Sequence, residues 1–339
     1  MRYPEFLKEN GTIGFIAPSF GAATPPYDAR FDHALKKFAQ MGYKCVEGPN
    51  VRASLNPGKS NSDKACGDEI NDFFTHDKSD VIISVGGGEL MCEDLPFVDF
   101  DAIAKADPKW FIGYSDNTNL TFLLPTLCDT AAIYGPCVGD FGMEPWHTSI
   151  GDAFDLLCGR KFSFSNYDKW EKEWDEDENP LKPYNVTEAY SQKIHKADSA
   201  EFEGRLIGGC LDCLVNLTGT RFDKVSEFNE RYKEDGIIWF LESCDLNVMS
   251  MRRALFHLEQ AGWFKYVKGF LIGRPLHHDE DFNGFTPYEA FTGILEKYGV
   301  PIVYDIDLGH LSPMIPFVSG GYGKVTAGDN SFNIEMLLK

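Results

Sequence analysis

The sequence lacks any apolar run of the roughly 20 residues that a membrane span requires. Its first residues mix acidic and basic side chains before a short apolar stretch that ends at Pro18, so the long hydrophobic region of a secretory signal is missing too. Basic residues are scarce, with 32 Lys and Arg against 52 Asp and Glu, a net charge of −20. So negative a surface repels phosphate backbones and anionic lipids, so we expect no nucleic-acid partner, no membrane partner and a cytoplasmic location.

Sequence motifs for nucleotides and metals are also missing. There is no G-x-G-x-x-G with an acidic residue on the next strand and no G-x-x-x-x-G-K-[ST] loop. There is no H-E-x-x-H, no EF-hand loop, and no second C-x-x-C to accompany Cys210 and Cys213, which we therefore interpret as ordinary helix cysteines. The nine cysteines are odd in number and mostly lie in apolar runs, as is typical of reduced thiols. We expect no cofactor and no metal.

A chain of 339 residues is long enough for two domains. Its first half alternates short apolar strands with helical patterns. The expected strands are 12–17, 43–47, 81–85 and 110–113, and the expected helices are 27–41, 68–75 and 117–127. Strands separated by helices predict an α/β fold with a mostly parallel sheet that helices cover on both faces.

The composition changes near residues 165–200, which are acidic, contain tryptophan and are interrupted by proline. Such a segment cannot supply a core face, so we interpret it as a linker or a long surface loop. The alternation then resumes with strands at 202–207, 236–241, 267–272 and 301–305, a helix at 248–261 and a hairpin at 324–338. We predict an N-terminal domain at 1–164, a loop at 165–200 and a C-terminal domain at 201–339.

Ser115 is the candidate nucleophile. It lies in Gly113-Tyr-Ser-Asp116, between an apolar strand and a helix, and a tight turn of this kind exposes the serine of α/β hydrolases. At a helix N-terminus the backbone N–H of Asp116 could stabilise an oxyanion. The alternative is that Ser115 or Asp116 only caps the helix. The glycines 86–88 follow another strand and could donate a second N–H, cradle a phosphate or simply form a turn.

A serine nucleophile needs an imidazole base that a carboxylate orients. His310 follows a buried strand on a proline-bounded loop, and His277 and His278 are the next candidates. Glu242 ends the apolar strand GIIWFL, where a carboxylate must be solvated or paired. It could orient the imidazole or form a salt bridge with Arg252.

Together these segments resemble the serine LD-carboxypeptidase family, peptidase family S66, which includes murein tetrapeptide carboxypeptidases and microcin C self-immunity proteins. The resemblance spans nearly the whole chain. It rests on GTIGFIAPS, VGGGE, GYSDNTNL, YGP, GRLIGG, IIWFLE, GRP and GH, in that order.

The resemblance implies a flavodoxin-like parallel-sheet domain followed by a swivelling β/α domain, in a cytoplasmic homodimer without a cofactor. It implies a triad of Ser115 as nucleophile, Glu242 as orienting residue and His310 as general base. The oxyanion would be bound by the N–H groups of Gly87 and Asp116.

Two substrates remain open for such an enzyme. One is the L,D bond before a terminal D-alanine of a murein peptide, whose carboxylate Arg274 or backbone N–H groups could bind. The other is the amide of an aminoacyl- or peptidyl-adenylate. The insertion at 165–185 favours the second, because immunity proteins stack a nucleobase on a tryptophan there, a role open to Trp170 or Trp174.

Two departures from the family pattern leave the substrate open. Cys210 stands where many relatives have asparagine, and Gly88-Glu89 replaces an aromatic and a small polar residue. A different class of function, a non-catalytic two-domain protein that binds a small ligand, is the alternative.

Overall fold

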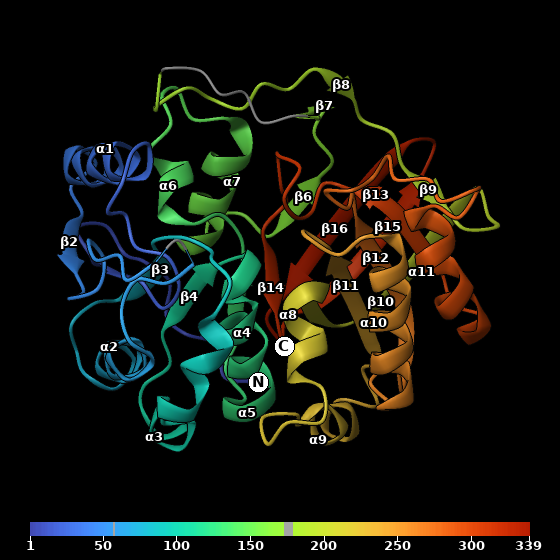
Figure 1. Ribbon diagram of the computed structural model, residues 1–339, viewed down its shortest axis with the longest axis horizontal. Helices are drawn as coiled ribbons and strands as arrows, with labels where there is room; N and C mark the ends of the chain where they lie inside the picture. Colours follow the sequence, from blue (N-terminus) through green and yellow to red (C-terminus); the bar gives the residue numbers. More distant parts are fainter. Residues whose placement is uncertain (57, 173–178) are drawn as a thin grey trace. The chain divides into compact units, whose positions relative to one another are not determined.

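The structure is a computed structural model that describes residues 1–56, 58–172 and 179–339 (Figure 1). These residues form two compact units. The first consists of 1–161 and the described part of 174–184, and the second of the described part of 162–173 and of 185–339. Each unit contains helices and paired strands, so the predicted α/β class is confirmed.

The paired strands of the first unit are all parallel. They follow the order β5 (Ala132–Tyr134), β4 (Trp110–Gly113), β3 (Val81–Ser84), β1 (Thr12–Ile16) and β2 (Lys44–Glu47). Every residue of β3 and β4 is buried, as expected for a parallel sheet that is covered on both faces.

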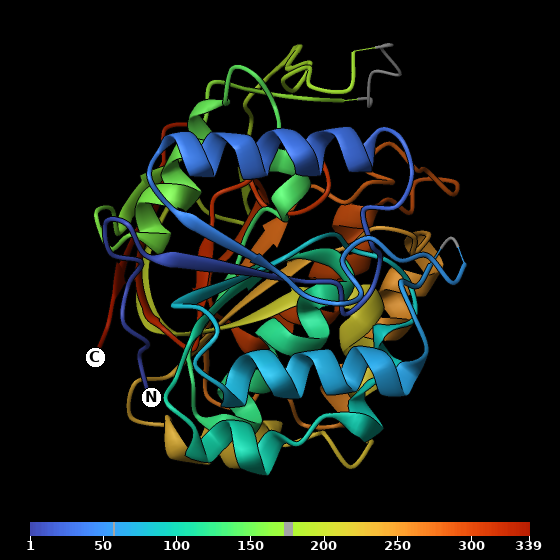
Figure 2. The ribbon, with the colours of Figure 1, turned by 90° about the vertical axis from the view of Figure 1, so that its left-hand side faces the viewer.

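The helices of the first unit cover both faces of its strands. They are α1 (Tyr27–Gln40), α2 (Asp63–Thr75), α3 (Phe100–Lys105), α4 (Thr118–Thr121), α5 (Leu123–Cys128), α6 (Val138–Phe141) and α7 (Thr148–Leu157), with 3-10 turns η1 (Met91–Glu93), η2 (Leu95–Phe97) and η3 (Ser115–Asn117). Figure 2 shows α1 on one side of the strands and α2 and α3 on the other.

Helix α1 follows the apolar spacing that predicted it. Phe31, Ala34 and Phe38 recur every three or four residues and are all buried. The ring of Phe15 on β1 meets Phe31 edge-on at 5.5 Å between centroids and stacks on Phe38 at 6.1 Å. These aromatic contacts anchor the helix to the sheet.

The sheet of the second unit is mixed. Its order is β6 (Ser163–Ser165), β16 (Ser331–Leu337), β15 (Tyr322–Gly328), β10 (Ser199–Cys210), β11 (Ile237–Glu242), β12 (Val267–Gly273), β13 (Ile302–Ile306) and β9 (Lys193–Ile194). The strands β10 to β13 pair in parallel, and the remaining pairs are antiparallel.

The other elements of the second unit are the two-stranded pair β7 (Lys169–Trp170) and β8 (Glu188–Ala189), the strand β14 (Phe317–Ser319), the helices α8 (Leu211–Leu217), α9 (Val225–Arg231), α10 (Val248–Gln260) and α11 (Pro287–Leu295), and the 3-10 turn η4 (Glu296–Tyr298). The predicted hairpin is β15–β16. Its two central residues, Asp329 and Asn330, both have positive φ, as a type I′ turn requires.

Two of the predicted helices have other bounds than the sequence prediction gave them. The helix expected at 117–127 is divided at Phe122 into α4 and α5. Pro125 lacks the N–H that would bond the carbonyl four residues earlier, which accounts for the break. Helix α2 begins at Asp63, five residues before the predicted start, because the Ser62 side chain accepts a hydrogen bond from the Ala65 N–H and caps it.

Among the described residues, no helix combines the length and the apolarity that a membrane crossing requires. All nine cysteines lie in the described ranges as free thiols.

Replacing Phe15 with alanine tests the aromatic core of the first unit. Phe15→Ala should lower the free energy of unfolding by about 3–5 kcal/mol, because it removes a fully buried ring and leaves a cavity. Chemical denaturation followed by circular dichroism measures the change. Phe97→Ala, at a ring that is 43% exposed, is the matched control and should cost about 1 kcal/mol or less. Equal losses for the two variants would contradict the prediction.

Candidate active site

Ser115 occupies a sharp turn in the first unit. Strand β4 ends at Gly113, and Ser115 opens the 3-10 turn that leads into α4. Its φ of 62° lies in the left-handed region, which residues with a side chain adopt only at a cost. Its N–H donates to the Tyr134 hydroxyl at 3.2 Å. This strained, half-exposed position between a strand and a helix is the local geometry of a nucleophile elbow.

Gly87 lies directly beside Ser115. A Cβ placed on Gly87 would come within 3.0 Å of the Ser115 Cβ and 3.1 Å of its Oγ, and 4.0 Å from the Asp116 nitrogen. Only glycine lets the two loops approach this closely without displacing one of them. The backbone of Gly87 and the N–H of Asp116 therefore both lie near the Ser115 hydroxyl, as an oxyanion hole requires.

The Asp116 side chain ties the turn to the loops that follow β1 and β3. Its buried carboxylate accepts hydrogen bonds from the Ser19 hydroxyl and, at 2.9 Å, from the Met91 N–H. The Asn117 amide donates to the Gly86 carbonyl at 2.8 Å. The backbone and the side chain of Asp116 thus have different surroundings, one beside Ser115 and the other in the protein interior.

Glu242 and His310 form a buried pair in the second unit. Glu242 is the last residue of β11 and is fully buried, while His310 follows β13 and is 5% exposed. The imidazole Nδ1 lies 2.8 Å from Glu242 Oε2. Gly309, with a φ of 101°, makes the approach possible, because a Cβ there would lie 2.8 Å from that same oxygen. A carboxylate held this way fixes the orientation of the imidazole ring.

The surroundings of His310 favour its protonated form. Burial acts to lower the pKa of His310, but the negative charge of Glu242 and hydrogen bonds with Cys244 and Glu242 outweigh it and raise the pKa well above its ordinary value. Cys244 was missed by the sequence analysis. Its only local signal is its position two residues after the strand-terminal glutamate. Burial raises the pKa of the Cys244 thiol, and the hydrogen bond to His310 opposes that rise.

Arg274 is buried beside the strand ends of the second unit. One Nη donates to the Asp305 carbonyl at 2.7 Å and the other pairs with Asp307, which is itself fully buried. The guanidinium lies 4.9 Å from the centre of the Trp170 ring. Asp307 also accepts a hydrogen bond from the Tyr167 N–H at 2.7 Å, so the ion pair holds the Trp170 segment against the loop that carries His310.

Trp170 is the member of the predicted tryptophan pair that the structure describes. Its Nε1 donates to the Ala189 carbonyl at 3.2 Å, and the His278 ring stands nearly perpendicular to the Trp170 ring at 5.3 Å between centroids. Trp174 lies outside the described residues.

The remaining residues considered from the sequence have identified surroundings. Arg252 donates to the carbonyls of Glu289 and Ala290 on α11. The Cys210 thiol hydrogen-bonds with Asp212 and Cys213. In the described ranges, no three His, Cys, Asp or Glu side chains are grouped so that they could hold a metal ion.

Comparison with known proteins gives the same family for both parts of the chain. Residues 13–135 match the LD-carboxypeptidase N-terminal domain model and residues 203–325 match the C-terminal domain model. A Vibrio cholerae protein, named only as a candidate carboxypeptidase, is 27% identical over 99% of this chain and 98% of its own. The Escherichia coli microcin C7 self-immunity protein MccF is 28% identical over 93% of this chain and 90% of its own.

Solved structures agree with this fold. MccF in complex with aspartyl sulfamoyl adenosine matches 99% of this chain and 98% of its own with a TM-score of 0.82 and 25% identity. An MccF-like protein from Bacillus anthracis covers the whole of both chains with a TM-score of 0.83 and 22% identity. From these matches over both units, the chain belongs to peptidase family S66, the LD-carboxypeptidases.

Proposed function

We propose that the protein is a serine peptidase or amidase in which Ser115, His310 and Glu242 act as a catalytic triad. The observation that carries the proposal is the buried 2.8 Å contact between His310 and Glu242, which gives the chain an oriented imidazole. The strained turn at Ser115, with Gly87 against its hydroxyl, supports serine as the nucleophile. Family membership supports hydrolysis of a peptide-like amide.

In the proposed reaction, Ser115 Oγ attacks the amide carbonyl while the imidazole of His310 accepts its proton at Nε2, since Nδ1 faces Glu242. The N–H groups of Gly87 and Asp116 bind the oxyanion of the tetrahedral intermediate. His310 then protonates the leaving amine, and water hydrolyses the acyl-enzyme with the same residue as base. This chemistry needs no metal or cofactor.

The substrate is either a murein-type LD-peptide or an aminoacyl- or peptidyl-adenylate. Structures of MccF hold aspartyl sulfamoyl adenosine, glutamyl sulfamoyl guanosine and adenosine monophosphate, which favours the second class for this chain. We propose that Trp170 contacts the base of such a substrate. Trp174 remains the other candidate for this role and lies outside the described residues. If Arg274 binds the carboxylate of an LD-peptide, it must first give up its ion pair with Asp307. Backbone N–H groups could bind the same carboxylate without breaking that pair.

We further propose a cytoplasmic homodimer, as the family resemblance implies. The negative charge of the chain, with 52 acidic against 32 basic residues, supports a small molecule as its partner rather than a nucleic acid or a membrane. Sedimentation of the purified protein measures the oligomeric state.

Removal of the nucleophile tests the proposed function directly. Ser115→Ala should lower kcat at least about 10³-fold, because a triad acts as a unit. Mass spectrometry of the products, with a murein tetrapeptide and an acyl-sulfamoyl adenylate analogue both offered, measures the activity and identifies the substrate. The variant Ser163→Ala, at an exposed serine, is the matched control and should remain active.

A fluorophosphonate should label the wild type at Ser115. A binding protein without catalysis would hydrolyse neither substrate and would not be labelled.

The pH dependence tests the pairing of His310 with Glu242. His310 must be neutral to accept a proton from Ser115. Because its pKa is raised, a higher pH is needed to deprotonate it, so kcat/KM should rise as the pH rises into the alkaline range. Glu242→Gln removes the charge that favours the imidazolium, so the rising limb should move to lower pH while kcat falls by several orders of magnitude. A profile that rises over the same pH range in both proteins would contradict the assignment.

The role of Trp170 separates the two substrate classes. If its ring stacks on a base, Trp170→Ala should lower kcat/KM for the adenylate about 10- to 100-fold, the contribution expected from one base–aromatic contact. Hydrolysis of a tetrapeptide should change by less than about threefold. Trp170→Phe, which keeps an aromatic face, is the control and should retain most of the adenylate activity. Equal losses on both substrates would indicate that the residue only supports the fold.

A further inference from the structure

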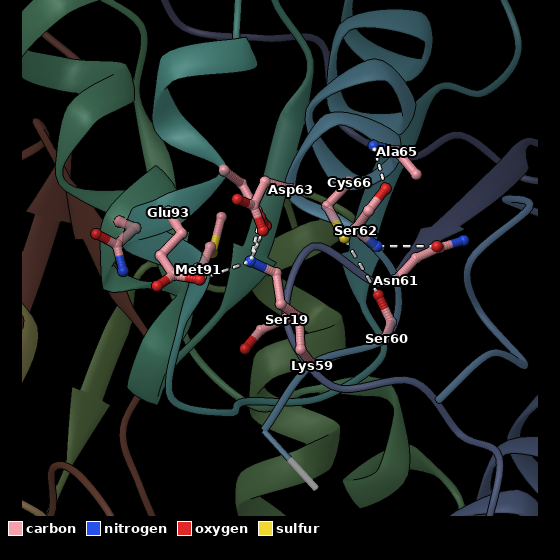
Figure 3. Close-up of polar contacts among 12 residues, drawn as sticks. Ser19, Lys59, Ser60, Asn61, Ser62, Asp63, Ala65, Cys66, Met91 and Glu93 are labelled. Carbon is pink, nitrogen blue, oxygen red and sulfur yellow. Dashed lines mark hydrogen bonds and ion pairs between the residues drawn. The ribbon is translucent and has the colours of Figure 1, made fainter. Parts of the chain in front are cut away.

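A buried ammonium group lies close to the proposed oxyanion-binding loops of the first unit. Lys59, in the segment between β2 and α2, is 2% exposed. Its Nζ lies 3.0 Å from Asp94 Oδ1 and 3.3 Å from Glu93 Oε2, and it also pairs with Asp63 (Figure 3). Asp63 and Glu93 are about half exposed, whereas Asp94 is fully buried. The essential pair is therefore Lys59 with Asp94.

Such a pair contributes little net stability, because the cost of removing both charges from water offsets most of their attraction. Removing one partner of the pair, by contrast, is strongly destabilising, because it leaves the other charge buried and unpaired. Burial raises the pKa of Asp94 to about 7 although Lys59 opposes the rise, so without the ammonium this carboxylate is either protonated or left unpaired in the interior. The pair therefore fixes how the segment around Lys59 lies against the turn that carries Asp94.

Both of these segments lead to the same oxygen atom of Asp116. On the Asp94 side, the Met91 N–H donates to Asp116 Oδ2 at 2.9 Å. On the Lys59 side, the Ser60 N–H donates to the Ser19 carbonyl at 2.6 Å, and the Ser19 hydroxyl donates to that same Oδ2. Figure 3 shows Ser19 and Met91 beside Lys59. The orientation of Asp116, whose N–H lies beside Ser115, depends on both.

The Lys59 segment also supports the second proposed oxyanion donor. The carbonyl of Gly58 accepts a hydrogen bond from the Glu89 N–H at 3.4 Å. A Cβ on Gly88, whose φ is +152°, would lie 2.9 Å from that carbonyl and would collide with the Ser19 hydroxyl. The Phe20 N–H donates to the Gly87 carbonyl at 2.8 Å. The glycine loop is thus packed against Gly58, the residue before Lys59, and against Ser19 and Phe20.

We propose that Lys59 is a positioning residue for the oxyanion hole. Through its ion pair with Asp94 it holds the loops that place the N–H groups of Gly87 and Asp116 beside Ser115. This inference rests on the proposed function, since it assigns those N–H groups to the oxyanion. Lys59 itself touches neither the substrate nor the reacting atoms.

The test replaces Lys59 with methionine, which has a similar length and no charge. Because a displacement of about 1 Å in a catalytic group can cost 10²-fold in rate, kcat should fall about tenfold or more while KM changes less than about threefold. Fluorophosphonate labelling of Ser115 should slow by a similar factor. Lys59→Arg keeps the charge and should recover most of the rate. Lys64→Met is the matched control and should behave as wild type, since among the described residues the exposed Lys64 pairs with Asp68 alone.

A second variant separates positioning from loss of stability. Lys59→Met combined with Asp94→Asn leaves no unpaired buried charge, so its melting temperature should return toward that of the wild type while its rate stays low. Recovery of both rate and stability in the double variant, or an unchanged kcat in Lys59→Met, would overturn the proposal.

Hydrogen–deuterium exchange gives a readout that does not depend on catalysis. In Lys59→Met, peptides covering 86–94 and 113–119 should exchange faster, while those from α1 should not change. Unchanged exchange in 86–94 and 113–119 would overturn the positioning role. If the wild type is neither active nor labelled at Ser115, the proposed function fails instead, and exchange still decides whether Lys59 orders these loops.

Discussion

The candidate active-site residues depend on one constraint of parallel sheets: the carboxyl ends of all the parallel strands lie at the same edge. In the first unit, the loops after β1, β3 and β4 bring Ser19, Gly87 and Ser115 to one place. In the second, the ends of β11 and β13 bring Glu242 and His310 together across 68 residues of sequence. Each half of the proposed machinery is thus assembled within a unit by the order of its own strands.

Buried charges then fix the loops that leave these edges. Three pairs do this: Glu242 with His310, Arg274 with Asp307, and Lys59 with Asp94. None is a strong source of net stability, because desolvation opposes the attraction. Each instead penalises any arrangement that separates the partners. Loops held by such pairs keep their geometry without regular secondary structure, which a site with fixed hydrogen-bond donors requires.

Asp116 shows how one residue can serve both the fold and the proposed chemistry. Its backbone N–H lies beside the Ser115 hydroxyl, while its carboxylate accepts hydrogen bonds from Ser19 and Met91 in the interior. Ser115, the residue just before Asp116, has the left-handed backbone conformation that forms this turn. The strain at that turn is offset by the bonds that its neighbours make, so the turn and its supporting loops form one unit of structure.

Local pattern in the sequence was sufficient for the α/β class, the strands β1 to β4 and β10 to β13, the hairpin β15–β16, the helices α1, α2 and α10, and the strand-end positions of Ser115 and Glu242. It did not predict the helices α3, α6, α7, α9 and α11. The predicted features depend on spacings of two to four residues, which set secondary structure directly. The contacts of His310 with Glu242 and Cys244, the approach of Gly87 to Ser115, and the enclosure of Lys59 by three carboxylates were decided only by the tertiary structure. Each joins residues whose partners are set by strand order and loop packing, and no local periodicity encodes which distant loops will meet.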